Sequence, residues 1–235
     1  MTDLRKAVFA GLMALGFGAA VLPALAADDL PKVLARLDAS AASFKSAQAD
    51  ITWDNTQTQP IEDTDRQIGT IIFQRKGGDV AVALHIKTDN GKTVDKDLVY
   101  ANGTGKLYEP RLKQMQVFKL GDKKAQLDSL LTLGFGGSGK DLEKSWAITS
   151  QGTEAVGGIT AEKLQLVPKD AALVKSVPKV LLWIDMNTGL AVKQQRFDPS
   201  GNYVVFSYGN VKQNVSVPGN AFEIKTAAGT QIVNH

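Results

Sequence analysis

The amino-acid sequence predicts a mainly β protein of the α+β class, in which a curled antiparallel sheet forms an open half-barrel covered by a helical lid. Three observations predict this fold. Apolar and polar residues alternate through most of the chain, Gly, Asn, Asp and Pro separate the alternating segments, and helical spacing is confined to residues 30–47 and 122–145. Parallel strands would need helical crossovers between them, so the sheet is expected to be antiparallel.

Residues 1–26 have the pattern of a cleavable secretory signal peptide. Arg5 and Lys6 precede an apolar run over residues 7–22, and small residues of the A-x-A type end at Ala26. The run is shorter than the roughly 20 residues that a membrane-spanning helix needs. We therefore expect cleavage near Ala26 and a periplasmic protein in which residues 27–235 form one domain. The chain has no Cys for lipid attachment, so we expect it to diffuse freely.

Residues 30–47 are predicted to form an amphipathic helix. Asp28 or Asp29 can cap its start, and Pro31 falls in its first turn. The apolar residues recur at spacings of three and four, which places them on one helical face. They are Leu30, Val33, Leu34, Leu37, Ala41, Phe44 and Ala47.

After this helix the apolar period changes to two, which is typical of strands joined by tight turns. Along residues 80–86, for example, Val80 and Leu84 share one face that we expect to point inward, whereas His85 falls on the other face. The predicted strands are 68–75, 80–86, 96–100, 112–118, 161–167, 179–185, 190–197 and 203–208.

Residues 122–145 interrupt the strands with a helical insertion. Leu127, Leu130, Leu131 and Leu133 recur at helical spacing before a Gly-rich break. A sheet of roughly ten strands curls under its own twist, and two helices are enough to cover only one of its sides. This insertion and the N-terminal helix are therefore expected to cover the inner side.

Composition excludes several classes of function. The formal net charge is +3, or +2 without residues 1–26, and no stretch gathers enough Lys or Arg to suggest nucleic-acid binding. The absence of Cys excludes thiol catalysis and thiolate metal sites. We expect no cofactor and no metal.

The remaining catalytic and nucleotide-binding patterns are weak. The glycines from Gly134 to Gly139 fit G-x-G-x-x-G but follow a helical segment, and Asp141 stands where a phosphate loop needs Ser or Thr. His85 and His235 are the only histidines, which leaves little for a catalytic triad. A pair of acids suited to glycoside hydrolysis stays open, but we expect a protein that is not an enzyme.

Apolar surface is the remaining feature that can indicate a function. A curled sheet with a lid has more inward-facing side-chain positions than two short helices can cover. The sequence therefore favours a closable apolar cavity. The residues expected to line the cavity and its lid are Leu34, Leu37, Phe73, Leu84, Ile86, Tyr100, Met115, Phe118, Leu130, Leu133, Trp183 and Phe206.

Three stretches together form a recognisable pattern. The predicted helix is followed by an alternating strand from Gly69 to Arg75, residues 100–117 read as a hairpin containing Gly-Lys-Leu-Tyr-Glu-Pro, and residues 198–229 hold Asp-Pro-Ser-Gly and Phe-Glu-Ile before a late glycine. In this order they resemble the LolA family of periplasmic lipoprotein carriers and its LolA-like relatives. The resemblance covers most of the chain after residue 26.

The resemblance implies a half-barrel whose apolar interior takes the acyl chains of a lipoprotein. It also implies partners, namely an inner-membrane ABC transporter that supplies the cargo and an outer-membrane acceptor that receives it. Arg75 matches the family's arginine that holds the lid closed, although Lys76 replaces the family's proline.

We expect a monomer. The alternatives are a carrier or sensor of another envelope lipid on the same scaffold and, less favoured, a periplasmic hydrolase.

Overall fold

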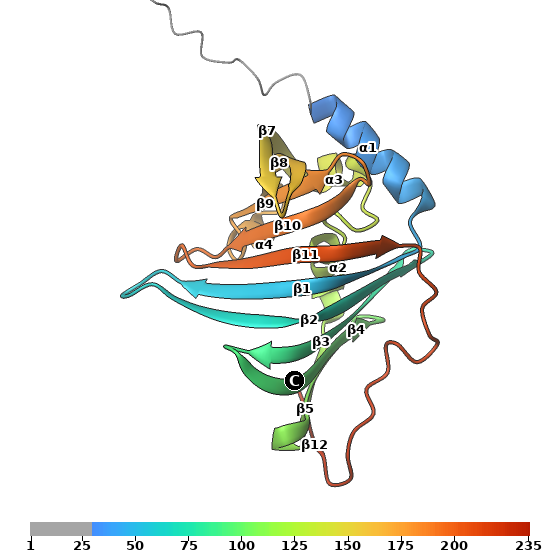
Figure 1. Cartoon of the computed structure of the whole chain (residues 1–235), viewed down its shortest axis with the longest axis vertical. Helices are drawn as coiled ribbons and strands as arrows, with labels where there is room; N and C mark the ends of the chain where they lie inside the picture. The colour runs from blue at the N-terminus through green and yellow to red at the C-terminus, as the bar shows by residue number, and fades with distance from the viewer. Residues whose placement is uncertain (1–29) are drawn as a thin grey trace, which may run out of the picture.

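The computed structural model describes residues 30–235 and places twelve strands in one sheet (Figure 1). Their order is β12-β6-β5-β4-β3-β2-β1-β11-β10-β9-β8-β7. Neighbouring strands are antiparallel except β12 and β6, which are parallel. Since β7 and β12 lie at opposite edges, the sheet stays open. The predicted β-rich class and open sheet are confirmed, whereas the predicted signal peptide lies outside the described residues.

Eight of the twelve strands lie where the sequence predicts a strand, and the other four, β1, β5, β7 and β12, were not predicted. The helices are α1 Leu30–Ser43, α2 Lys124–Leu131, α3 Gly139–Ser145 and α4 Ala171–Val174, with 3-10 turns at Pro110–Leu112 and Gly121–Lys123. The strands are β1 Ser46–Gln57, β2 Asp63–Lys76, β3 Asp79–Asp89, β4 Lys92–Ala101, β5 Thr104–Glu109, β6 Gln114–Lys119, β7 Trp146–Val156, β8 Ile159–Pro168, β9 Lys179–Asp185, β10 Leu190–Phe197, β11 Tyr203–Gln213 and β12 Gln231–Asn234.

The first predicted helix is too long, because α1 ends at Ser43 and β1 begins at Ser46. Phe44 and Ala47 are buried in the same core as the helix, so the apolar spacing continues across the helix–strand junction. The strand β1 was missed because its sequence, SAQADITWDNTQ, has few apolar residues. Yet β1 pairs with β2 on one side and with β11 on the other, at the centre of the sheet.

The predicted helical insertion is confirmed as α2 and α3, separated by a Gly-rich stretch, and we refer to residues 120–145 as the insertion. Figure 1 shows α2 behind the central strands β11 and β1. One apolar core contains Leu133, Phe135 and Leu142 of the insertion. It also contains residues of the strands that precede and follow the insertion in the sequence. The helix α1 packs beside α3, and its Val33 and Leu37 enter the same core.

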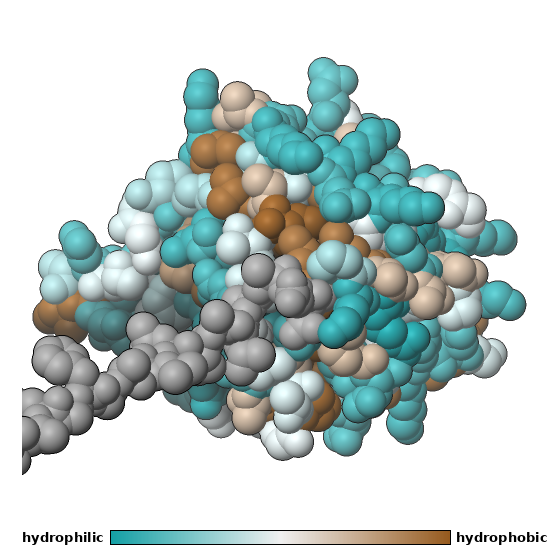
Figure 2. All heavy atoms as spheres, turned by 90° about the horizontal axis from the view of Figure 1, so that it is seen from above, coloured by the Kyte–Doolittle hydropathy of each residue, from teal (hydrophilic) through white to brown (hydrophobic). Residues whose placement is uncertain are grey.

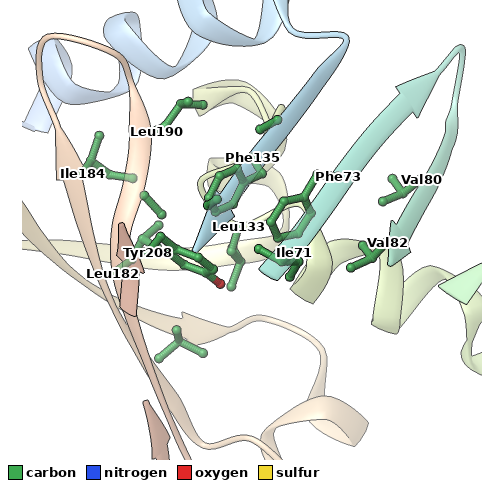
Figure 3. Close-up of a cluster of buried hydrophobic side chains, with 14 of the residues drawn as sticks. Ile71, Phe73, Val80, Val82, Leu133, Phe135, Leu182, Ile184, Leu190 and Tyr208 are labelled. Carbon is green, nitrogen blue, oxygen red and sulfur yellow. The ribbon is translucent and has the colours of Figure 1, made fainter. Parts of the chain in front are cut away.

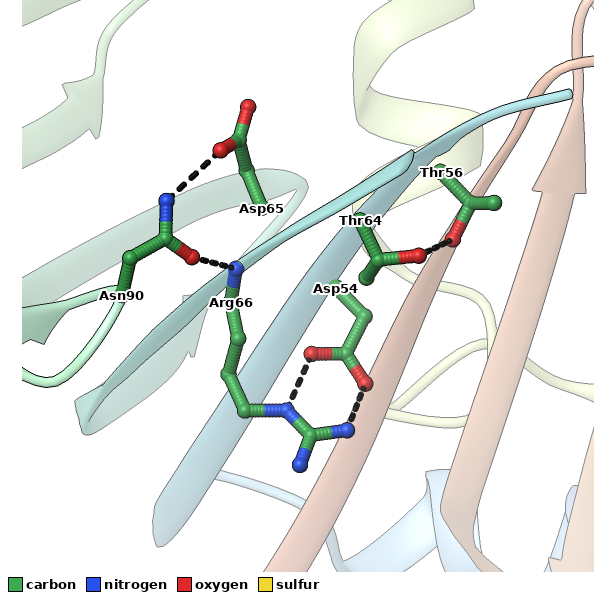
Figure 4. Close-up of polar contacts among 6 residues, drawn as sticks. All are labelled: Asp54, Thr56, Thr64, Asp65, Arg66 and Asn90. Atoms are coloured by element: carbon green, nitrogen blue, oxygen red, sulfur yellow. Dashed lines mark hydrogen bonds and ion pairs between the residues drawn. The ribbon is translucent and has the colours of Figure 1, made fainter. Parts of the chain in front are cut away.

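Polar contacts fix the register where the sheet meets its turns (Figure 4). Arg66 on β2 donates to both carboxylate oxygens of Asp54 on β1, at 2.7 and 2.8 Å, and the hydroxyls of Thr56 and Thr64 lie 2.8 Å apart. In the β3–β4 turn, the Asn90 side chain accepts from the backbone N–H of Arg66 at 2.8 Å. These bonds join three strands and fix their register. A slip of one residue would turn every side chain of a strand to the opposite face of the sheet.

The face of the molecule drawn in Figure 2 is largely hydrophilic. On the face drawn in Figure 2, hydrophobic residues gather in a central strip bordered by hydrophilic ones. Within residues 30–235, no helix is long and apolar enough to cross a membrane.

The close approach of the insertion to β10 depends on Gly134. This residue has a φ of +76°, and an added Cβ would lie 2.3 Å from the Cβ of Ala191. We expect Gly134→Ala to lower the free energy of unfolding by about 2–4 kcal/mol, since it adds overpacking to left-handed strain. Urea denaturation followed by circular dichroism measures this change.

The matched control is Gly77→Ala, because Gly77 also has a positive φ, +64°, but nothing lies within 4 Å of its added Cβ. This variant should lose only about 1–2 kcal/mol, the cost of the left-handed backbone. Equal losses in the two variants would mean that the insertion does not pack on β10 as described.

Candidate functional site

An apolar cavity of about 170 Å³ lies between the sheet and α2. Its lining comes from β1, β2, β3, β4, β10 and β11 on one side and from three leucines of α2 on the other. The residues are Ile51, Trp53, Ile71, Phe73, Val82, Leu84, Leu98, Leu127, Leu130, Leu131, Gln194, Arg196, Phe206 and Tyr208.

Strand alternation selects these side chains. In β3 the inward residues Val82 and Leu84 are 4% and 5% exposed, whereas the His85 side chain on the opposite face is 43% exposed. Trp53 and Phe206 face each other across β1 and β11, with ring centroids 5.5 Å apart. The expectation that Val80, Val82, Leu84 and Ile86 point inward is confirmed.

Phe135 anchors the insertion in the core beside the cavity (Figure 3). Its ring stacks on Phe73 with centroids 4.2 Å apart and meets Tyr208 edge-on at 4.8 Å. Gly134 and Gly136 flank it, both with positive φ, and an added Cβ at Gly136 would lie 2.5 Å from the Phe44 ring. The Gly-rich stretch is therefore a tightly packed plug carrying one aromatic side chain, rather than the flexible break that its composition predicts.

Side chains of the sheet also hold the insertion by hydrogen bonds. Arg75 on β2 donates to the carbonyl of Gly136, the Tyr100 hydroxyl on β4 donates to Asp128 on α2, and Gln194 on β10 donates to the carbonyl of Leu133. The last two bonds are 2.5 Å long. Burial raises the pKa of Tyr100, and its bond to Asp128 raises it further, so the phenol stays protonated as the donor.

One charge lies in the lining of the cavity. Arg196, on β10, is the only ionised side chain among the described lining residues. Burial lowers the pKa of Arg196. Burial likewise raises the pKa of the Tyr208 hydroxyl, so this group is neutral.

The structure brings most of the predicted cavity residues around one core, but only some reach the cavity. Phe73, Leu84, Leu130 and Phe206 line it. The next set packs in the surrounding core, where Leu34 and Leu37 belong to α1, which packs beside α3. These residues are Leu34, Leu37, Ile86, Tyr100 and Leu133.

Trp183 was assigned to the wrong face of the sheet. Its neighbour Leu182 belongs to the main core, so strand alternation turns Trp183 to the opposite side. There it packs in a second small cluster with Ala161 and Val192. The ammonium groups of Lys163 and Lys193 lie 5.0 and 4.3 Å from its ring centroid, as cation–π contacts.

Met115 and Phe118 also lie away from the cavity. Leu98 lines the cavity and pairs with Leu107, so the next residue, Tyr108, and its partner Met115 face the other way. Phe118 is 37% exposed and stacks on His235. Both residues are on β6, next to the edge strand β12.

The histidine and glycine patterns that the sequence disfavoured for catalysis are not among the residues that line the cavity. His85 lies on the outer face of β3, where its Nδ1 is 2.8 Å from Asp97. The segment from Gly134 to Gly139 follows α2 instead of a strand. Among residues 30–235, no three His, Cys, Asp or Glu side chains gather as metal ligands would.

The residues that sequence reasoning missed are mainly the polar ones. Gln194 and Arg196 sit two residues apart in L-A-V-K-Q-Q-R-F, a segment whose C-terminal half has no apolar alternation to mark a face. Trp53 was missed together with β1. Phe206 was the residue that could have indicated them. Its strand, β11, pairs with both β1 and β10, so the residues paired with Phe206 lie on the same face of the sheet.

Comparison with solved structures gives low identities over most of the chain. An uncharacterized conserved protein from Thermus thermophilus has a TM-score of 0.53 and 10% identity, covering 87% of this chain and 98% of that one. The crystal structure of MucB has a TM-score of 0.49 and 17% identity, covering 88% and 66%. A LolA superfamily protein from Nitrosomonas europaea has a TM-score of 0.38 and 13% identity, covering 83% and 97%.

The comparison with curated proteins found no match. In contrast, the family model of the MucB/RseB N-terminal domain matches residues 66–215, which is more than half of the chain and runs from β2 to the end of β11. It includes the whole insertion and most of the cavity lining. The lipoprotein carriers named by the sequence resemblance are not the family matched, and this chain belongs to the MucB/RseB N-terminal domain family.

Proposed function

We propose that this protein is a periplasmic binding protein of the carrier type, which takes up an acyl chain between its sheet and the insertion. The observation that carries the proposal is the apolar cavity formed jointly by the sheet and Leu127, Leu130 and Leu131 of α2. Each methylene moved from water into such a site contributes about 0.8 kcal/mol. No catalytic group is needed, so we propose a binding function rather than an enzyme.

The size of the cavity implies that α2 moves during uptake. A cavity of roughly 150 Å³ lined by apolar side chains accommodates a ligand the size of benzene, and the cavity here is about 170 Å³. Several acyl chains of a lipoprotein exceed this volume. We therefore propose that residues 120–145 act as a lid, which swings from the sheet when cargo enters and is held closed by Arg75, Tyr100 and Gln194.

In its most specific form, the proposal is a soluble shuttle for lipoproteins. It would receive cargo from an inner-membrane ABC transporter and deliver it to an outer-membrane acceptor as a monomer, with residues 27–235 acting as one domain. The second candidate is a carrier or sensor of another envelope lipid. The small volume of the cavity favours this alternative, because one chain requires less displacement of α2 than several do.

Organic extraction of the purified protein followed by mass spectrometry tests these forms. Copurifying lipoprotein supports the shuttle, and free glycerolipid, polyprenoid or fatty acid supports the second candidate. An extract without lipid, together with turnover on a panel of glycans, would contradict both and favour a hydrolase.

The cavity itself is tested by Leu130→Gln. An amide placed in the apolar lining costs about 1–3 kcal/mol, so the affinity for the neutral fluorescent probe N-phenyl-1-naphthylamine should fall about tenfold. The matched control is Leu112→Gln, since Leu112 is 64% exposed and is not one of the lining residues. Fluorescence titration measures both, and an equal affinity in the two variants would place the probe outside the cavity.

A further inference from the structure

The cavity contains a cation without a partner. Arg196 makes no ion pair and no hydrogen bond within residues 30–235, and the lining holds no Asp or Glu. Other arginines of the described residues have partners, since Arg66 pairs with Asp54, Arg75 donates to the carbonyl of Gly136, and Arg36 donates to the carbonyls of Met186 and Asn187. Leaving a partly buried guanidinium unpaired costs stability, because its desolvation is not offset.

Nearby polar groups in the cavity are also donors. The indole Nε1 of Trp53 is buried and has no hydrogen-bond partner. The hydroxyl of Tyr208 is kept neutral by burial, and the side-chain amide of Gln194 already donates to Leu133. An apolar lining that carries a cation and further donors, but no anion, matches a ligand with an apolar chain and an anionic head.

Arg196 stands close to the end of its strand. It is the residue before Phe197, the last residue of β10, and pairs with Val180 and Val204 on the neighbouring strands. The leucines of α2 and the inward residues of β3 line the other parts of the cavity. A chain lying along the apolar lining can thus place its head beside the guanidinium.

We propose that the cavity selects single-chain amphiphiles with an anionic oxygen head group, a carboxylate or a phosphate, and that Arg196 is the residue that recognises the head. This inference rests on the proposed function, since it requires that acyl chains enter the cavity. Trp53 and Tyr208 supply further hydrogen bonds to the head. A neutral lipid of the same chain length would leave Arg196 unpaired and bind less tightly.

The experiment compares ligands that share one chain and differ in the head. Octanoate, octyl phosphate and 1-octanol displace N-phenyl-1-naphthylamine from the full-length exported protein at pH 7.5. We expect at least one anion to bind about tenfold or more tightly than octanol, which corresponds to a charge-assisted hydrogen bond. The tighter of the two anions identifies the head group.

Arg196→Leu should remove this preference while leaving octanol binding within about threefold. The variant should also melt at a higher temperature, because it removes an unpaired buried charge. Arg196→Lys should keep part of the preference, and Trp53→Phe should reduce it while keeping an aromatic ring. The control Arg66→Leu removes an arginine that lies outside the cavity and should leave the preference intact.

The outcomes separate this inference from the proposed function. If octanol and the anions all fail to displace the probe, acyl binding itself is wrong. If octanol binds as tightly as both anions, acyl binding stands but head recognition is wrong. A preference for anions that survives in a folded Arg196→Leu variant would also overturn the assignment of Arg196.

Discussion

Leu182→Ala should lower the free energy of unfolding by about 2–5 kcal/mol, which is typical of deleting a fully buried leucine side chain. Leu182 is 0% exposed and belongs to the main core, where Leu164 on β8 pairs with it across the strands. The cavity left behind cannot collapse easily, since the rigid sheet holds its neighbours. Urea denaturation measures the change.

The adjacent residue provides a matched control. Leu181 lies on the outer face, where it is only partly buried and packs against the small cluster around Trp183. Leu181→Ala should therefore cost about 1 kcal/mol or less. A larger loss for Leu181 than for Leu182 would mean that the faces of β9 are exchanged, and Trp183 would then belong to the cavity.

This pair of leucines also shows why part of the site was hidden in the sequence. In β3 apolar residues alternate with small or polar ones, so the inward face could be predicted, and the structure bears it out. In β9 the run V-L-L-W-I is apolar throughout because both faces are covered. The apolar periodicity therefore does not show which face of the sheet Trp183 lies on. Its large apolar side chain favoured the wrong assignment, to the cavity.

The polar residues of the cavity lining were hard to predict for the opposite reason. Gln194 and Arg196 look like surface residues, because polar side chains are mostly exposed. Only the pairing of β10 with β11 shows that they share a face with Phe206. The helical insertion, in contrast, was predictable since leucines at helical spacing interrupt an otherwise alternating chain. The burial of Phe135 was not, because it depends on contacts with distant strands.

Arg75→Leu should make cargo leave about 10- to 100-fold more slowly. The guanidinium of Arg75 donates to the carbonyl of Gly136, and a hydrogen bond from a charged group contributes about 1.5–3 kcal/mol. This bond exists only while the insertion lies on the sheet, so its loss destabilises the closed, empty state. Bound cargo holds the insertion open, so the open, loaded state competes with the closed, empty state. When the closed state is less stable, the cargo is retained for longer.

The measurement is a stopped-flow displacement of bound N-phenyl-1-naphthylamine, followed by transfer of loaded cargo to acceptor vesicles. Loading should persist in Arg75→Leu, and transfer should fail or slow in proportion to the dissociation rate. Tyr100→Phe removes the corresponding bond to Asp128 on α2 and should slow release in the same direction. Arg66→Leu should not, because its partner Asp54 lies on the sheet.

An unchanged release rate in Arg75→Leu would mean that the Gly136 contact does not stabilise the closed state that competes with cargo. Because Phe135 is inserted between Phe73 and Tyr208, the aromatic plug would then be the main contact that holds the insertion closed. Phe135→Leu discriminates between these cases, since it weakens the plug without touching the hydrogen bond. Slower release of probe in Phe135→Leu but not in Arg75→Leu would assign closure to packing, whereas slower release in both would assign it to packing and the hydrogen bond acting together.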